Sequence, residues 1–353
     1  MRRYYLLALL SVSLAALVAQ EKRVTLIFAG DAMHHMPQLY AAKTDSGYNY
    51  QPVFELIKNK LATADIAGIN LETTFGGAPY TGYPLFSSPT EYAAALHQAG
   101  FNLFFTANNH CLDSGTKGFQ QTIQTIKALG AKQTGTFISK EDRALRYPLM
   151  LIKNGIRIAL LNYTYGTNGL TAKPPHIVNL IDTTLIQQDI AAAQKLQPDI
   201  IIAVMHWGEE YHTQPSKQQK QLTQFLFNHN VRIIIGHHPH VVQPLHTLAQ
   251  GDSITHAVFY SLGNFVSNQR KQNRDGGMLA HIVLSKAHQD APVSIQMVDY
   301  SLLWVQKKHE AGKPIFRILP IQADTTGYNL QPHERWAMDR FVRGATNILE
   351  TKL

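Results

Sequence analysis

The chain contains very little cysteine, a modest amount of charge and no internal repeats. Cys111 is the only cysteine among 353 residues, so an internal disulfide and a metal cage of several thiolates are both excluded. Charged residues make up 16% of the chain, below the roughly 25% of an average globular protein. No low-complexity tract or fixed-period repeat is visible, which argues against a disordered chain and against a solenoid.

The charge balance is basic but diffuse. The 32 Lys and Arg residues exceed the 24 Asp and Glu residues by 8. These basic residues are scattered, and no nucleic-acid-binding motif accompanies them, so we expect no nucleic-acid partner. The excess favours an anionic substrate or an envelope surface, although a merely soluble basic protein would have the same balance.

The first residues have the pattern of an export signal. Arg2 and Arg3 precede an apolar run from Tyr4 to Ala19, and polar residues follow it. A run of this length is short for a membrane span, and its small residues near Ala19 suit cleavage. We predict a signal peptide over 1–19 and an exported, periplasmic or extracytoplasmic protein. The alternative is an uncleaved signal that anchors the chain to the membrane.

Short apolar runs alternate with amphipathic runs through the first third of the chain. Strands are predicted at 23–30, 65–72 and 101–110, and helices at 52–64, 88–100 and 116–130. Such alternation indicates βαβ units and a largely parallel sheet. Asn154-Gly155 predicts a hairpin, the chain after 256 is mostly β, and a helix over 332–349 closes it. We expect one α/β domain over 24–353, built on two mixed sheets.

Polar residues that can bind metals recur where the predicted strands end. Five strands are followed by such residues, namely Asp31, Asn70 and Glu72, Asn108 to His110, His206 to Glu210, and His237 to His240. In an open α/β sheet the carboxyl ends of the strands form the edge that binds ligands. Each residue alone has an ordinary explanation in a turn or at the surface. Their coincidence at equivalent positions predicts a metal site.

The donor types narrow the choice of metal. Imidazole, carboxylate and amide donors suit Zn²⁺, Mn²⁺ or Fe, and two such ions generate hydroxide and bind an oxyanion. In "GHHPH" the spacing of His238 and His240 turns both side chains the same way if the segment is extended, and Pro239 stiffens it. We therefore predict His238 and His240 as ligands, with His237 in a supporting position.

Six motifs together resemble a known family. "GDAMHH", "INLETTF", "FSSPTEYAAALHQAGFNLFFTANNHCLDSGTKGFQQTI", "VMHWGEEY", "GHHPHVVQPL" and "FYSLGNF" resemble the CapA-type bacterial capsule-synthesis proteins, which are involved in poly-γ-glutamate capsules. The resemblance runs in order from about Val24 to Phe265. That family is related to the calcineurin-like metallophosphoesterases, which implies a four-layer α/β/β/α sandwich with metals at the strand ends.

The resemblance also implies roles for individual residues. The metal ligands would be Asp31, Glu72, Asn109, His206, His238 and His240, and His110 would act as an acid or stabilise an oxyanion. Three positions depart from the phosphoesterase pattern: Met33 stands where a histidine is expected, Glu72 replaces an aspartate, and the last motif is Gly-x-His-x-His. One ion or an altered pair of ions is therefore expected.

Several neighbouring residues have alternative roles. Asp113 is a candidate to orient His110 or a turn residue before a helix. Glu209 is our candidate general base, although Glu209 and Glu210 also fit a solvated loop. Cys111 fits a small buried hydrophobe better than a nucleophile. Asn264 is expected to line the pocket, and Trp207 and Tyr211 to pack beside it.

The sequence thus predicts an exported, metal-dependent hydrolase that acts on a phosphoester or on an amide linkage of an anionic polymer, in capsule or cell-envelope polymer metabolism. The expected partners are an anionic envelope polymer or a phosphorylated small molecule, with other capsule-synthesis membrane proteins as further candidates. The alternative is a non-catalytic assembly, export or anchoring factor that binds the polymer through a degenerate metallophosphatase fold.

Overall fold

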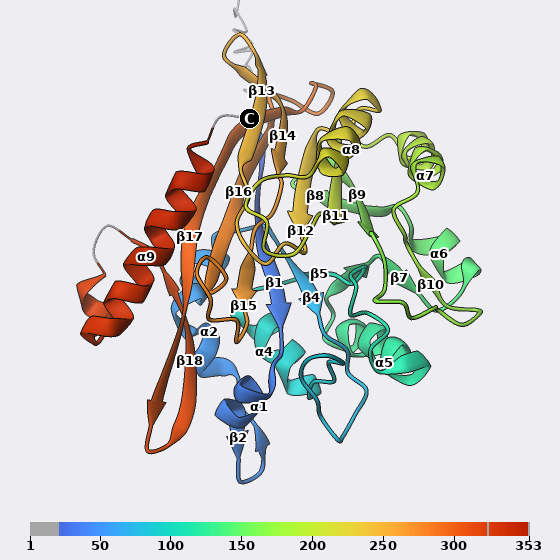
Figure 1. Cartoon of the computed structure of the whole chain (residues 1–353). Helices are drawn as coiled ribbons and strands as arrows, with labels where there is room; N and C mark the ends of the chain where they lie inside the picture. The colour runs from blue at the N-terminus through green and yellow to red at the C-terminus, as the bar shows by residue number, and fades with distance from the viewer. Residues whose placement is uncertain (1–20, 323–324, 352–353) are drawn as a thin grey trace, which may run out of the picture.

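A computed structural model describes residues 21–322 and 325–351 (Figure 1). The predicted signal segment, 1–19, lies outside the described residues. Within them, no helix combines the length and the apolar character that a membrane span requires.

The first half of the structure is built on seven strands in the order β6-β5-β4-β1-β16-β17-β18. β1, β4, β5 and β6 are parallel neighbours, and β16, β17 and β18 follow as antiparallel strands. The bounds are β1 (Lys22–Met33), β4 (Ile66–Glu72), β5 (Leu103–Phe105), β6 (Lys132–Thr134), β16 (Gly276–Lys286), β17 (Ser294–Glu310) and β18 (Lys313–Pro320). The short β15 (Asn264–Val266) runs parallel to the end of β1.

The second half has the order β14-β12-β11-β9-β8, with β13 beside β14. β14, β12, β11 and β9 are parallel, and β8 and β13 are antiparallel to their neighbours. The bounds are β8 (Leu149–Lys153), β9 (Ile156–Thr164), β11 (Ile200–His206), β12 (Ile233–His237), β13 (Leu245–Gln250) and β14 (Ser253–Phe259). Two small pairs lie apart, β2 (Lys43–Thr44) with β3 (Gly47–Tyr48) and β7 (Thr136–Phe137) with β10 (Ile177–Val178).

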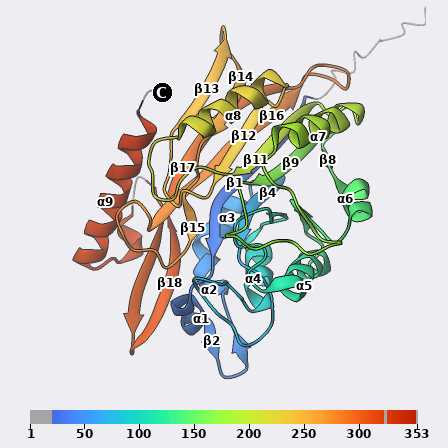
Figure 2. The same ribbon diagram turned by 45° about the vertical axis from the view of Figure 1, so that its right-hand side comes forward.

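Helices cover the outer faces of both halves (Figures 1 and 2). The exception is the last helix, whose buried side chains belong to the cluster between the halves. They are α1 (Met36–Ala42), α2 (Gln51–Phe54), α3 (Lys58–Leu61), α4 (Thr90–Ala99), α5 (Gly115–Ala128), α6 (Lys140–Arg146), α7 (Thr183–Lys195), α8 (Lys217–Asn228) and α9 (Pro332–Leu349), with 3₁₀ turns η1 (Glu55–Ile57) and η2 (Thr326–Tyr328). The predicted helix 52–64 is divided into α2, η1 and α3, whereas the helix predicted over 332–349 is confirmed as α9.

Alternating side chains of the central strands build the layers. In β1, Leu26 and Phe28 point into a buried cluster that also contains Ile202 of β11, so the two halves pack face to face. Ile27 of β1 points the other way, into a cluster with residues of α2, α3 and α4. Ala203 of β11 likewise faces α7 and α8. This period of two defines four layers, and the predicted α/β/β/α sandwich is confirmed.

One detail differs from the expected pair of separate sheets. Ile254 of β14 pairs with Ile295 at the start of β17, so 14 strands of the described chain belong to one continuous hydrogen-bonded sheet. The 17-residue β17 is long enough to pair with β16 and β18 in the first half and with β14 in the second. Figures 1 and 2 show α9 lying along β17.

Gly30 brings the end of β1 against the segment before β15. The backbone N–H of Asp31 donates to the Gly263 carbonyl at 2.9 Å. A Cβ atom at position 30 would lie 2.0 Å from that same carbonyl oxygen, so only glycine allows the approach. The residue before Asp31 therefore fixes where the Asp31 carboxylate is presented.

We expect Gly30→Ala to lower the free energy of unfolding by about 2–3 kcal/mol, because the backbone at Gly263 must move. Chemical denaturation measures this difference. Gly166→Ala is the matched control, since no neighbouring atom lies within 4 Å of a Cβ atom built there; we expect a change within about 0.5 kcal/mol. Equal effects of the two substitutions would refute the close-approach argument.

Candidate metal centre

The parallel strands of both halves end at one edge, which we call the carboxyl edge. Its metal-capable side chains are at most 3% exposed, and they are Asp31 on β1, Glu72 on β4, Asn109 and His110 after β5, His206 on β11, and His237, His238 and His240 at the end of β12. Strand register brings Met33 opposite Glu72 and His206 opposite His237. The structure therefore brings together the six residues predicted as ligands.

The Asp31 carboxylate is surrounded by donors from both halves of the sheet. Its Oδ2 lies 3.0 Å from His240 Nδ1 and accepts the backbone N–H of His238 at 3.3 Å. Its Oδ1 accepts from Asn70 Nδ2 at 2.8 Å. Burial raises the pKa of Asp31, but the contacts with His237 and His240 outweigh burial and hold the pKa well below its ordinary value. Asp31 is therefore an anion inside the protein.

Glu72 has a buried oxygen without a hydrogen-bond partner. Its Oε1 lies 3.6 Å from His240 Nε2 and 3.9 Å from His206 Nε2, without a hydrogen bond to any described residue. Its Oε2 accepts from Asn70 Nδ2 at 3.1 Å. Burial, followed by the charge of Asp31, raises the pKa of Glu72 well above its ordinary value. A nearby cation would remove this penalty for the ionised form.

Asn109 connects the loop after β5 to β11. Its Oδ1 lies 2.9 Å from Nε2 of His206. The pKa of His206 is lowered well below its ordinary value by burial and by the neighbouring His238, so the ring stays neutral, which is the form that binds metals. Tyr165 stacks on the same ring with a centroid distance of 6.2 Å and covers it from outside.

The segment 238–240 is not extended, and the expectation of an extended segment is wrong. φ is +96° at His238 and +57° at His240, so both residues occupy the left-handed region. The chain turns sharply after β12, so that the His240 imidazole lies against Asp31 of β1. The His238 ring lies 4.5 Å from the Tyr165 ring and 4.8 Å from the His206 ring, centroid to centroid. A positive φ is uncommon outside glycine and costs on the order of 1–3 kcal/mol. Such strain is typical of functional sites.

The donor set fits a divalent cation. Two groups of three each place one ligand atom per residue within 4.8 Å of the others: Asp31 with Glu72 and His206, and Glu210 with His238 and His240. Two buried atoms of these side chains, Glu72 Oε1 and His238 Nδ1, lack hydrogen bonds within the described chain. The neighbouring His237 ring makes no hydrogen bond there either, although its Nδ1 lies 3.3 Å from Asp31 Oδ1. Buried polar atoms without partners are costly, and a cation supplies partners to carboxylate and imidazole together.

His110 and Asp113 form a hydrogen-bonded pair beside this cluster. His110 Nδ1 lies 2.7 Å from Asp113 Oδ2, and the same oxygen accepts the backbone N–H of Phe86 at 2.7 Å. The ring of Phe86 meets the His110 ring edge-on at 4.6 Å. Nδ1 therefore carries the proton, so Nε2 accepts when the ring is neutral and donates when it is protonated. Asp113 has the orienting position proposed for it from sequence.

Of the two glutamates in "HWGEEY", the structure brings Glu210 rather than Glu209 to the imidazoles. Glu210 belongs to the group with His238 and His240. Glu209 is largely exposed and lies 3.6 Å from Nδ1 of His212. The candidate base chosen from sequence thus belongs to neither metal-capable group. Sequence could not separate two adjacent acids in a turn, because the turn decides which one faces inward.

The histidines after Met33 lie in different surroundings. Met33 is buried and presents a thioether where the resemblance led us to expect a histidine. His34 contacts the Tyr50 hydroxyl through Nε2 at 2.7 Å and packs against Tyr92, away from Asp31. His35 Nδ1 accepts the backbone N–H of Asn268 at 3.3 Å. Neither histidine contacts the Asp31 carboxylate.

Asn70, one of the polar residues that the sequence places at a strand end, connects two of the predicted ligands. Its Nδ2 donates to both Asp31 and Glu72, and its Oδ1 accepts from Asn108 Nδ2 at 3.2 Å. The signal was present in "INLE", because a polar residue two positions before Glu72 on a buried strand points to the same face.

Cys111 and Trp207 follow their expected packing roles, and Asn264, expected to line the pocket, is buried beside the turn that carries His240. Cys111 is buried, and burial raises its pKa to about 12, which disfavours a thiolate nucleophile. Trp207 is buried and donates through Nε1 to the Tyr260 carbonyl. Asn264 is buried at the start of β15, and its Nδ2 donates to the His240 carbonyl at 3.3 Å.

The fold and the site define a class of protein: an α/β/β/α sandwich with a buried, metal-capable cluster at its carboxyl edge. The family described as "Bacterial capsule synthesis protein PGA_cap" matches residues 25–269. The chain belongs to this family.

Curated relatives agree with this assignment. The chain is 28% identical over 263 residues to "Capsule biosynthesis protein CapA" of Bacillus anthracis, covering 71% of this chain and 61% of that protein. It is 32% identical over 200 residues to "PGA biosynthesis protein CapA" of Bacillus subtilis, covering 54% of this chain and 49% of that protein. The chain therefore spans about half to three fifths of the length of these relatives.

Solved structures are more distant. The NAD nucleotidase of Haemophilus influenzae is similar with a TM-score of 0.48 and 12% identity, covering 93% of this chain and 61% of that chain. A calcineurin-like phosphoesterase of Bacillus subtilis is similar with a TM-score of 0.41 and 12% identity, covering 94% of this chain and 99% of that chain.

We expect Glu210→Gln to weaken Mn²⁺ binding by about 10–100-fold, the range for losing a group that supports a metal site. Glu209→Gln is the matched control, since it removes the same charge one residue away, and we expect a change below about 2-fold for an exposed charge. Calorimetric titration of metal-free protein measures both affinities. An equal loss in both variants would show that only net charge matters.

Acid is expected to destabilise the fold through His34. Burial, followed by the charge of His35, lowers the pKa of His34 from 6.5 to about 3. Between these values the unfolded chain binds a proton that the folded chain does not, so the free energy of unfolding falls as the pH falls through this window and is fully retained above it.

We expect His34→Phe to flatten this dependence by up to about 1.4 kcal/mol per pH unit. Urea denaturation in EDTA at pH 7, 6 and 5 measures the slope independently of bound metal. An unchanged slope in His34→Phe would contradict the neutral state of the buried ring.

Proposed function

We propose that this chain is a metal-dependent hydrolase of capsule or cell-envelope polymer metabolism. The observation that carries the proposal is the convergence of two metal-capable groups beside an oriented histidine–aspartate pair at one edge of the sheet. A cation site alone would fit a structural role. A positioned proton donor next to it is what hydrolysis of a phosphoester or amide requires.

The residues divide into two tasks. The candidates to hold divalent ions are Asp31, Glu72, Asn109, His206, His238 and His240, joined by Glu210. Mn²⁺, Zn²⁺ or Fe, as one or two ions, would supply Lewis acidity and a hydroxide at neutral pH. His110, oriented by Asp113, would donate a proton from Nε2 to the leaving group or stabilise an oxyanion.

The relatives support the proposed setting. Both are named for capsule or PGA biosynthesis, so we propose an anionic envelope polymer, or a phosphorylated small molecule, as the substrate class. Export through segment 1–19, to the periplasm or another extracytoplasmic location, and association with capsule-synthesis membrane proteins are part of the same proposal. The net charge of +8 favours an anionic substrate.

A second candidate function is a non-catalytic factor that binds the polymer during assembly or export. Met33 favours it, because a buried thioether stands where the related phosphoesterases have a histidine ligand. Such a site would bind metal and polymer without turnover.

Assays of metal-free protein, reloaded with Mn²⁺ or Zn²⁺, on a generic phosphodiester and on poly-γ-glutamate separate the two functions. The hydrolase proposal predicts turnover that EDTA abolishes and that His206→Ala lacks. Bound metal with polymer binding but no turnover on either substrate would favour the second function.

Within the hydrolase proposal, we expect Asp113→Asn to lower kcat by about 10²-fold or more while leaving the metal content unchanged. The substitution keeps the shape of the side chain but loses the carboxylate that orients the His110 proton. Steady-state kinetics with elemental analysis of the same sample check both parts. Loss of metal together with activity would indicate a role in building the site.

A further inference from the structure

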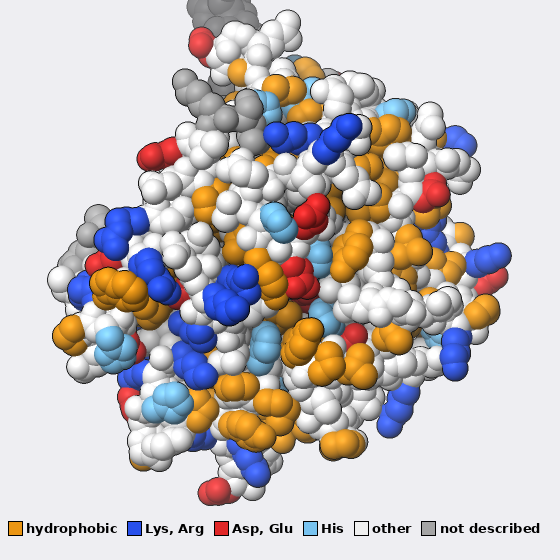
Figure 3. All heavy atoms as spheres, in the orientation of Figure 1, with side chains coloured by type: hydrophobic (Ala, Val, Ile, Leu, Met, Phe, Trp, Pro, Cys, Tyr) orange, Lys and Arg blue, Asp and Glu red, His pale blue; other side chains and the backbone are white. Residues whose placement is uncertain are grey.

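The loop between β15 and β16 places basic residues beside the metal-capable cluster. This loop covers residues 267–275 and contains Arg270, Lys271 and Arg274. Figure 3 shows Lys and Arg side chains close to Asp, Glu and His side chains near the middle of the visible face, over the segment that follows β15.

Arg274 is held in place by an aromatic ring and not by an ion pair. Its Cζ atom lies 3.3 Å from the ring centroid of Tyr211, a cation–π contact. Across residues 21–322 and 325–351, no carboxylate lies within 4.0 Å of its guanidinium and no hydrogen bond from it is present. By contrast, Arg270 packs over Trp304 and faces Asp275 at 3.8 Å.

Two contacts connect Arg274 to the metal-capable residues. The Tyr211 ring lies 6.1 Å from the His240 ring, centroid to centroid. Asn264 Nδ2 donates both to the Arg274 carbonyl, at 2.8 Å, and to the His240 carbonyl, at 3.3 Å. Side chain and backbone of Arg274 are therefore both positioned relative to the turn that carries His240.

We propose that Arg274 binds an oxyanion of the substrate, a carboxylate or a phosphate, next to the metal centre. A guanidinium presents paired N–H donors that match either group. Stacking on Tyr211 restricts the side chain before binding, so less conformational freedom is lost when the anion arrives. This inference rests on the proposed function and deepens it by naming the group that recognises the substrate.

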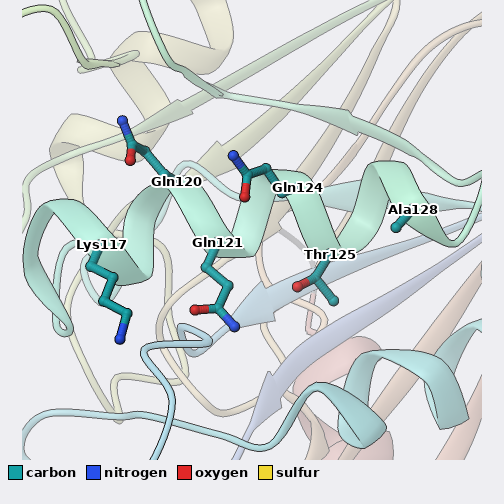
Figure 4. Close-up of a pocket in the computed structure, with 6 residues that line it drawn as sticks. All are labelled: Lys117, Gln120, Gln121, Gln124, Thr125 and Ala128. Carbon is teal, nitrogen blue, oxygen red and sulfur yellow. The ribbon is translucent and has the colours of Figure 1, made fainter.

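The hollow along α5 is a weaker candidate for a ligand site than Arg274. The hollow along α5 is bordered by Lys117, Gln120, Gln121, Gln124, Thr125 and Ala128 (Figure 4). These residues include no His, Cys, Asp or Glu, and one helix supplies all of them. Arg274 is the stronger candidate because its charge is unpaired and its position is fixed.

Calorimetric binding of two probes tests the proposal on protein loaded with Mn²⁺ and freed of excess ion. The probes are inorganic phosphate and a short γ-linked glutamate oligomer. We expect Arg274→Gln to weaken at least one of them by about 10-fold or more, the effect of losing a charge-assisted hydrogen bond. The probe that weakens identifies phosphate or carboxylate as the recognised group.

Two further variants make the test specific. Lys271→Gln removes an exposed charge of the same loop, and we expect a change below about 2-fold. Arg274→Lys keeps the charge but loses the paired donors, so an intermediate affinity is expected. Affinity within 2-fold of the unaltered protein in Arg274→Gln, an equal loss in Lys271→Gln, or no binding of either probe by the unaltered protein would overturn the proposal.

The binding experiment distinguishes failure of this inference from failure of the proposed hydrolase function. The readout here is affinity and needs no turnover, so a protein that binds the probes through Arg274 but hydrolyses nothing would keep this inference and favour the non-catalytic function.

Discussion

The burial of the Asp31 carboxylate is the constraint on which the rest of the site depends. An anion without solvent must receive donors from the protein or bind a cation. Here the donors come from β4 through Asn70 and from the turn after β12 through His238 and His240. Gly30 allows β1 to approach closely enough for these contacts to form. One buried charge therefore connects the two halves of the sandwich.

The fold makes this convergence possible because strands of both halves deliver their carboxyl ends to the same edge. Glu72 and Asn70 arrive on β4, His206 on β11, and the two histidines after β12. The continuous pairing through β17 fixes the halves relative to each other. A shift of either half would separate Asp31 from His240, and both the metal-binding and the hydrolytic proposals depend on their proximity.

Much of the architecture was predictable from sequence. Apolar runs indicate which segments are buried, and turn residues indicate where those segments end. The helix 332–349 and the six ligand candidates follow from local patterns or from the family resemblance. Three features did not follow, each for a physical reason. The left-handed turn at His238 and His240 depends on tertiary contacts, the choice of Glu210 over Glu209 depends on the separate turn after β11, and the pairing of Ile254 with Ile295 joins segments far apart in sequence. The free guanidinium of Arg274 likewise emerges only from packing against Tyr211.

Anomalous diffraction from crystals of the protein grown with Mn²⁺ would examine the central claim most directly. The account predicts a metal peak within bonding distance of Glu72 Oε1 and of at least one imidazole of His206, His238 or His240. Absence of any peak at the carboxyl edge under saturating Mn²⁺, with these side chains ordered as described, would contradict it.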